Sequence, residues 1–355
     1  LPGASARVVA GSAYNLANTL ASQGAHEEAI RLLELAGERS QEVDGAWELR
    51  LSIINSLAGA LSARGRYAEA LEAREASLAM VTQGYPPGHV RIAQTRNNLA
   101  SDLNLVGRVE EALPHFDAAL GIMREALGDS HPSVAAAHNN RGRALAELAR
   151  YEEALEDYAR AEAIVAPLAP ASDRRLMTVR LSRADALVAL GRLPEAETLL
   201  GELDQAGAQS NDEVQRAMRE VVWSRLFSAK RRFAESEARA LRAAEAAMGA
   251  FPKGSGLAAL ALGHAADAIA RQGRTDAALE HIAQGNRQIV GIAGDIDRSA
   301  IRFIRERHAL LSRLQRSQLA EEFLQADLLR LRDALPADDP RLRIVHAIAR
   351  AAPHD

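Results

Sequence analysis

Asparagine side chains recur at a fixed spacing in the first part of the chain. Asn97, Ser101 and Asn104 stand at i, i+4 and i+7, so they share one face of a helix. That face lies roughly 200° around the helix from the apolar row that begins at Leu99. A primary amide offers one acceptor and two donor hydrogens, the counterpart of what a peptide backbone presents. A row of such amides predicts a surface that holds an extended peptide by its main chain.

Asparagine is a mediocre helix former, so its repeated use on one stripe calls for an explanation. The residues that we predict to contact a peptide are Asn15, Asn18, Asn55, Asn97, Asn98, Ser101, Asn104, Asn139, Asn140 and Arg143. Selectivity would come from side-chain pockets beside this row.

A structural role is the alternative for these amides. They would then bond to carbonyl groups of neighbouring helices or loops and only fix the stacking of the chain. We expect this more of the second Asn of each pair, as in Asn98 and Asn140, than of the first, as in Asn97 and Asn139. The stripe of the first Asn points away from the leucine row.

Arg143 follows Asn139 by one helical turn. A guanidinium is a planar fork of donors that pairs with a carboxylate or a phosphate, so Arg143 predicts an acidic group on the partner. A salt bridge to Glu147 or Asp185 within the chain is an equal alternative, and it would be worth little if exposed.

A repeat of about 42 residues runs along the whole chain. Its anchor is a small residue that recurs every 40 to 42 positions, at Ala29, Ala70, Ala112, Ala154, Ala196, Ser236, Ala278 and Ala320. An apolar residue stands nine positions before each anchor, and an Arg stands four before it in all but the first unit. We interpret this Arg as a residue of the turn surface. The sustained period predicts an α-solenoid of helix–turn–helix units.

The small anchor, the turn glycine and the Leu-Ala pair of each unit resemble the tetratricopeptide repeat. The opening Asn97-Asn98-Leu99-Ala100 and the connector Leu127-Gly128-Asp129-Ser130-His131-Pro132 are similar to the kinesin-light-chain type, whose units are longer than the usual ~34 residues. The resemblance is sharp from about Val8 to Val165, and beyond it only the period persists.

This resemblance implies a role for the amides. In kinesin-light-chain-like proteins the Asn row of the inner helices holds cargo peptides, which by position implies the same for Asn55, Asn97, Asn98, Asn139 and Asn140. Similar repeats also occur in bacterial multidomain signalling proteins, where they follow Ser/Thr kinase domains.

The expected fold is therefore all-α: a right-handed superhelical α-solenoid of about eight helix–turn–helix repeats with a C-terminal capping helix. Residues 1–166 would hold repeats 1–4 and the Asn-lined groove, residues 167–335 the degenerate repeats 5–8, and residues 336–355 the cap and tail. Pro167 and Pro170 mark the first boundary, and a helix over 341–351 would shield the last apolar edge.

Composition and missing motifs exclude several other classes of function. A net charge of −4 leaves no basic excess for nucleic acid, and no apolar run approaches the ~20 residues of a membrane helix. Cysteine is absent, and the ten His residues form no metal-binding motif. We therefore expect no catalysis, no cofactor and no metal, in a protein of the cytoplasm by default.

The sequence thus predicts a non-catalytic protein–protein interaction scaffold whose concave groove binds an extended peptide segment of a partner. One alternative is the regulatory or sensor portion of a larger bacterial signalling enzyme such as a Ser/Thr kinase, which the absence of a Met before Leu1 favours. Its groove would take a segment of its own parent chain. The other alternative is a self-associating architectural module that uses the apolar residues Leu181, Val221 and Val222.

Overall fold

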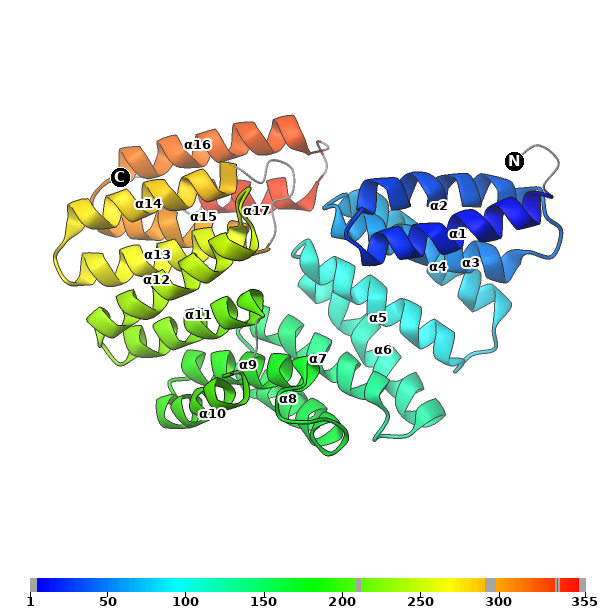
Figure 1. The fold of residues 1–355 in the computed structure, drawn as a ribbon, viewed down its shortest axis with the longest axis horizontal. Coiled ribbons are helices and arrows are strands. Elements are labelled where there is room, and N and C mark those ends of the chain that lie inside the picture. Colours follow the sequence, from blue (N-terminus) through cyan, green and yellow to red (C-terminus); the bar gives the residue numbers. More distant parts are fainter. Residues whose placement is uncertain (1–4, 209–211, 291–297, 336, 338, 351–355) are drawn as a thin grey trace. The chain divides into compact units, whose positions relative to one another are not determined.

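The structure, a computed structural model, describes residues 5–208, 212–290, 298–335, 337 and 339–350. Over these ranges the chain forms α-helices and one short 3-10 helix, and no β-strand occurs in them (Figure 1). Successive helices form hairpins that pack on the next hairpin along the chain. The predicted all-α solenoid is confirmed. Leu1 and residues 351–355 of the predicted tail lie outside the described ranges.

We call the leading member of each hairpin its first helix and the other its second helix. The first helices are α1 (Ala6–Ser22), α3 (Trp47–Ala63), α5 (Val90–Leu105), α7 (Pro132–Glu147), α9 (Arg174–Ala189), α11 (Glu213–Ala229), α13 (Gly256–Arg271) and α15 (Arg298–Arg313). The second helices are α2 (His26–Gln41), α4 (Tyr67–Gly84), α6 (Val109–Leu127), α8 (Tyr151–Val165), α10 (Leu193–Ala206), α12 (Phe233–Ala250), α14 (Thr275–Val290) and α16 (Ser317–Ala334). The chain ends with α17 (Pro340–Arg350).

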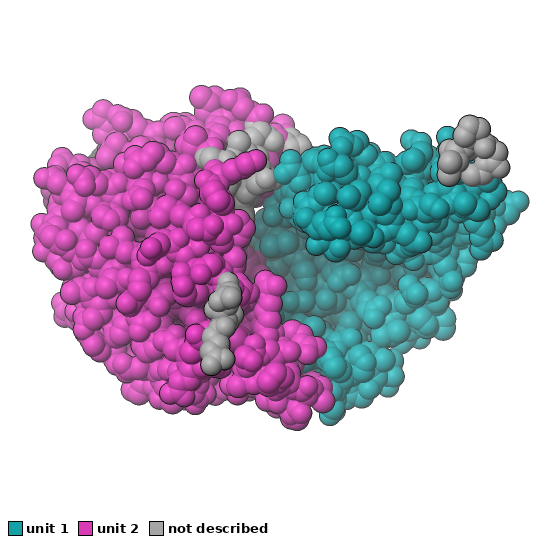
Figure 2. Space-filling view, in the orientation of Figure 1, with its two compact units in different colours: residues 1–140 teal, residues 141–355 magenta. Residues whose placement is uncertain are grey.

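The helices gather into two compact units, residues 1–140 and residues 141–355 (Figure 2). We call them unit 1 and unit 2. The division falls inside α7, whereas the sequence places a boundary at Pro167 and Pro170. There the chain continues from α8 into the short helix η1 (Ala166–Leu168), and α8 still packs against α9. The prolines therefore shape a connector without interrupting the stacking.

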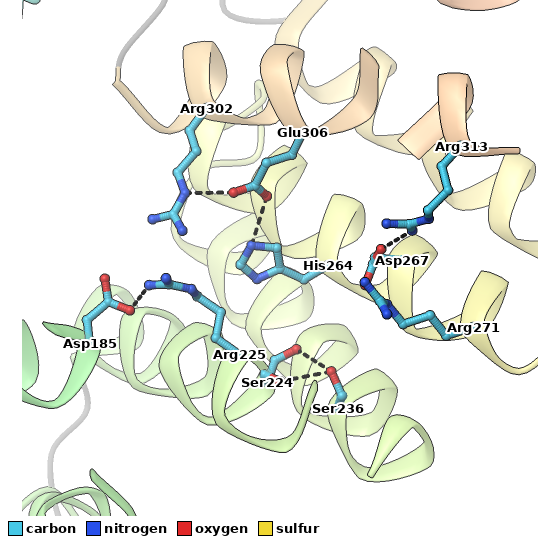
Figure 3. A network of polar contacts seen from close by, with 10 residues as sticks. All are labelled: Asp185, Ser224, Arg225, Ser236, His264, Asp267, Arg271, Arg302, Glu306 and Arg313. Carbon is cyan, nitrogen blue, oxygen red and sulfur yellow. Dashed lines mark hydrogen bonds and ion pairs between the residues drawn. The ribbon is translucent and has the colours of Figure 1, made fainter. Parts of the chain in front are cut away.

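The small anchor of each repeat is buried in the packing of its hairpin. All seven alanine anchors are completely buried. In the sixth repeat Ser236 takes this position at 1% exposure, and its hydroxyl donates to the Ser224 carbonyl oxygen at 2.9 Å and lies 3.1 Å from Ser224 Oγ (Figure 3). A larger side chain would separate the helices, because protein interiors are close-packed.

The turn between first and second helix always contains one residue in the left-handed backbone region. In five turns it is a glycine with φ between 76° and 82°: Gly24, Gly65, Gly107, Gly191 and Gly273. The other three turns reach the same region with Ala149, Arg231 and Gln315, at φ of 57° to 59°. This conformation costs an L residue about 1–2 kcal/mol, so the helix packing on either side must hold these three turns in place.

In five of the seven repeats that carry it, the recurrent Arg before the second helix binds the Glu that stands three residues later. In four of these pairs the Arg is bidentate: Nε donates to Oε1 and Nη2 to Oε2 of the Glu, at 2.6 to 2.7 Å. The four pairs are Arg66–Glu69, Arg108–Glu111, Arg150–Glu153 and Arg192–Glu195. These side chains are all more than a third exposed, so each pair adds little stability. The interpretation of this Arg as a turn-surface residue is confirmed.

The last hairpin is covered by α17. Leu342 and Val345 of this helix join the apolar cluster that contains Leu324, Leu328 and Leu331 of α16. The predicted capping helix is thereby confirmed. In the described part of the chain, no helix combines the length and the apolar character that a membrane span needs.

The turn conformation makes two substitutions act in opposite directions on stability. A Cβ on Gly191 would meet no atom within 4 Å, so Gly191→Ala tests the backbone conformation alone. We expect it to lower the free energy of unfolding by about 1 kcal/mol, and Ala149→Gly to raise it by about 0.5 kcal/mol, after the opposing effects on the unfolded chain. Urea unfolding followed by circular dichroism measures both. Changes of the same sign would contradict this account of the turns.

Candidate functional site

A pocket opens in unit 1 on the face formed by the first helices α1, α3 and α5. Its volume is about 320 Å³, and part of its wall comes from α4. The polar part of its lining includes Tyr14, Asn55, Ser56, Arg91, Gln94 and Asn98. No carboxylate lines it, so the pocket suits neutral hydrogen-bonding groups or an anion.

An exposed polar stripe on α5 forms one side of this pocket. Arg91, Gln94 and Asn98 are exposed and stand at i, i+3 and i+7, so they share one helix face. Asn15 occupies on α1 the position that Asn98 occupies on α5, and it is exposed as well. Within the described ranges, neither of these two amide side chains forms a hydrogen bond to the chain itself. Both are available to a ligand.

Asn55, in contrast, belongs to a buried network that joins α3, α4 and α5. Its Oδ1 accepts from Arg74 Nη1 at 3.1 Å and from Ser77 Oγ at 3.0 Å. Arg74 Nε also donates to Asp102 Oδ2 at 2.9 Å, and Ser62 Oγ donates to Asp102 Oδ1 at 2.8 Å. The Arg74 and Asp102 side chains are only 9% and 6% exposed. The Asn55 amide oxygen therefore serves the stacking of repeats 2 and 3.

Asn97 and Asn140 bond to each other across neighbouring first helices. Asn140 Nδ2 donates to Asn97 Oδ1 at 3.4 Å, a long hydrogen bond between α5 and α7 within unit 1. The Ser101 hydroxyl donates to the Asn97 carbonyl oxygen at 2.9 Å, so it too is engaged inside its helix. These half-buried groups lie at the edge of the exposed stripe.

The structure differs from the expected ranking of the two Asn positions. The sequence predicts peptide contact for Asn55, Asn97 and Asn98 and expects a structural role more of Asn98, but Asn55 and Asn97 are engaged within the chain and Asn98 is exposed. The cause is the extent of burial on a first helix. α5 packs against both α4 and α6, so most of its circumference is buried and only the arc around Asn98 remains open.

The remaining predicted amides differ in their surroundings. Asn104 is only 6% exposed, so it lies inside the helix packing, and its contact with a peptide stays a prediction. Asn18 and Asn139 are half-buried. The Oδ1 atom of Asn139 is buried and accepts no hydrogen bond from the described residues.

Arg143 lies on the part of α7 that belongs to unit 2. Neither of its predicted partners within the chain pairs with it, because Glu147 binds Arg298 at 3.1 Å and Asp185 binds Arg225. Burial lowers the pKa of Arg143, the neighbouring Arg298 lowers it further, and Glu147 acts in the opposite direction. A guanidinium in this setting remains a candidate for binding an anionic group.

The apolar residues of the later first helices are not a surface. Leu181, Val221 and Val222 are 3%, 6% and 6% exposed and belong to the apolar core of unit 2. They therefore cannot form the self-association surface that the sequence suggests as an alternative function.

Arg91, Gln94 and Tyr14 are functional candidates that the sequence reasoning did not include. The i, i+3, i+7 spacing of Arg91, Gln94 and Asn98 is visible in the sequence and is the signal that would find them. The described residues contain no group of three or more His, Asp or Glu side chains that could hold a metal ion.

Stacked two-helix units with a small buried anchor define an α-helical repeat protein. Residues 9–83 and 91–166 match the family model described as Tetratricopeptide repeat. These two segments are tetratricopeptide repeats, as the sequence predicts, and the hairpins after them continue the same architecture. No curated protein sequence matches the chain.

Solved structures support this assignment. The chain is similar to a putative kinesin light chain of Podosopora anserina with nearly identical TPR-like repeats, at 25% identity and a TM-score of 0.50, over 59% of this chain and 99% of that chain. The quorum sensor NprR of B. thuringiensis, in its apo form, shares the fold at 15% identity and a TM-score of 0.63, over 78% of this chain and 75% of that one.

A third similar structure is the Rap conjugation gene regulator of the plasmid pLS20 in complex with the Phr* peptide. It is 11% identical, with a TM-score of 0.60, and the match covers 79% of this chain and 73% of that chain. The identity is low, so this likeness establishes the fold only.

The two kinds of amide should respond differently to removal. Asn55→Ala takes away the acceptor of the buried Arg74 and of Ser77, which should lower the free energy of unfolding by about 1–3 kcal/mol. Asn98→Ala, at an exposed amide, should change it by less than about 0.5 kcal/mol. Chemical unfolding of both variants measures the difference, and equal losses would show that Asn98 also serves the fold.

Proposed function

We propose that unit 1 binds an extended segment of a protein on the face formed by its first helices, so that the chain acts as a protein–protein interaction scaffold. We call the face that the first helices form the inner face of a unit. The observation that carries this proposal is the pocket on α1, α3 and α5, which has exposed amides at its edge and no carboxylate in its lining. The segment belongs either to a separate protein or to another part of the parent chain.

Each part of the face has a distinct task in this proposal. The exposed amides of Asn98, Gln94 and Asn15 donate to and accept from the peptide main chain, which makes binding tolerant of sequence. The pocket receives one peptide side chain and supplies selectivity. Arg91, on the rim, selects an acidic residue, because its side chain has no ion-pair partner among the described residues.

Asn55 and Asp102 have a supporting task. Their bonds to Arg74 neutralise this buried guanidinium and hold α3 and α5 in register. The exposed amides on these helices are then displayed at a constant spacing, so a peptide does not have to order the face when it binds.

The similar proteins support the proposal by analogy. The Rap regulator of pLS20 shares the fold and is seen in complex with a peptide. Fold alone does not establish function, so the exposed amides carry the proposal.

Asn98→Ala tests the role of the exposed amides. Peptides selected from a random display library on the full chain would be measured against each variant by fluorescence anisotropy. We expect Asn98→Ala to weaken binding about tenfold, which corresponds to about 1.4 kcal/mol, a reasonable value for lost amide hydrogen bonds. Gln83→Ala on α4 is the control, because it removes an exposed amide outside the pocket. Selection of no peptide, or equal binding by both variants, would refute the proposal.

Arg91→Gln tests the preference for an acidic residue. We expect the variant to bind acidic peptides more weakly than the wild type does, and to bind neutral peptides about equally. The affinity of the wild type for acidic peptides should fall as salt rises from 50 to 500 mM NaCl, since salt screens exposed charges, and the variant should lose most of this dependence. An unchanged salt dependence would show that Arg91 does not contact the acidic group.

A further inference from the structure

Charged residues recur at one position of the first helices in unit 2. The position eleven residues before the anchor reads Arg143, Asp185, Arg225 and Asp267 in four successive repeats. Asp185 of α9 pairs with Arg225 of α11, the next first helix along the chain. Further along, α15 adds Arg302 and Glu306, which bond to each other at 2.8 Å. The inner face of unit 2 is therefore a network of ion pairs.

Carboxylates bridge pairs of guanidiniums elsewhere in this unit. Glu162 accepts from Arg180 at 2.7 Å and from Arg183 at 2.8 Å. Asp267 binds both Arg271 and Arg313, which approach it from two helices (Figure 3). Where two guanidiniums come together, one anion normally neutralises both.

Arg225 and Arg302 lack such a bridge. Figure 3 shows the Arg302 guanidinium directed toward that of Arg225, with Asp185 beside Arg225 and Glu306 beside Arg302. Each arginine has its own carboxylate, but in the network drawn no acidic group lies between the two cations. The two forks therefore face the same space from opposite helices.

The electrostatics of the two arginines agree with this geometry. Their side chains are 22% and 29% exposed, so water screens them only in part. Burial lowers the pKa of Arg225 to about 10, the charge of Arg302 contributes in the same direction, and the charge of Glu306 acts in the opposite direction. Placing an anion between the two guanidiniums would relieve this repulsion.

His264 supplies a further polar atom at this place. Its Nε2 lies 3.0 Å from Glu306 Oε2, and its ring stands between Glu306 and Arg225 (Figure 3). The other ring nitrogen, Nδ1, is buried and has no hydrogen-bond partner in the described part of the chain. Buried polar atoms are almost always satisfied, so this nitrogen indicates a missing partner.

We propose that the inner face of unit 2 holds an oxyanion, the carboxylate or phosphate group of a ligand, between Arg225 and Arg302. The anion takes the place that Glu162 and Asp267 occupy between the other arginine pairs. The two guanidinium groups provide planar, two-point recognition of an oxyanion. This site is distinct from the peptide face of unit 1 and does not depend on it.

The test uses the full chain and two small probes, inorganic phosphate and acetate. Each is titrated at constant ionic strength, with chloride as the balancing anion, and binding is followed by isothermal titration calorimetry and by the rise of the thermal midpoint. Saturable binding of phosphate or acetate by the wild type is expected, and the comparison of the two shows which oxyanion the site prefers. Failure of both probes to bind would overturn the proposal.

Two variants with opposite expected effects on anion affinity distinguish a loss of the binding site from a general loss of stability. Arg302→Gln should weaken binding of the preferred probe at least tenfold. Asp185→Asn should strengthen it several-fold, because Arg225 then loses its competing carboxylate. Arg271→Gln is the control, since this arginine is held by Asp267 on another part of α13, and it should leave binding unchanged.

Several outcomes would contradict the assignment. Equal weakening by Arg302→Gln and Arg271→Gln, or weakening by Asp185→Asn, would mean that the anion binds elsewhere. If Arg302→Gln does not fold, as judged by circular dichroism, the wild-type titration and the sign of the Asp185→Asn effect still decide. Peptide binding by unit 1 serves as an independent readout, so failure of one site leaves the other measurable.

Discussion

The close contact between the two helices of each hairpin, at the small anchor, is the constraint on which the rest of the structure depends. Every alanine anchor is completely buried, and Ser236 is admitted because its hydroxyl bonds to Ser224. The connecting turn of every hairpin enters the left-handed region, even with Ala149, Arg231 or Gln315 in the turn. Packing energy spread over a hairpin thus outweighs a local cost of about 1–2 kcal/mol.

This contact also determines which side chains are displayed. A first helix that packs against two neighbouring second helices keeps only a narrow open arc, as α5 does around Asn98. A side chain beside the arc, such as Asn55, is drawn into hydrogen bonds that join successive repeats. The same residue type therefore supports the stacking at one position and faces outward at the next.

The two units present different surfaces although they are built from the same type of repeat. In unit 1 the position fourteen residues before the anchor carries Asn15, Ser56, Asn98 and Asn140, which are neutral hydrogen-bonding groups. In unit 2 the same position carries Ser182 and Val222 and then His264 and Glu306, and the last two bond to each other. Amides suit a peptide main chain and charged groups suit an oxyanion, so a change of side chain at equivalent places is enough to change the class of ligand.

The sequence by itself determined the repeat, its anchors, the turn glycines, the surface Arg of the turns and the capping helix. These features depend on the spacing of residues along the chain, which the sequence shows directly. It also pointed to the Asn-rich first helices. Only the tertiary structure decided that Asn98 is exposed while Asn55 and Asn104 are not, and that Asp185 binds Arg225 rather than Arg143. Residues one position apart point in directions that differ by about 100° around a helix. How much of the helix surface is buried depends on neighbouring helices from other repeats, which the local sequence does not show.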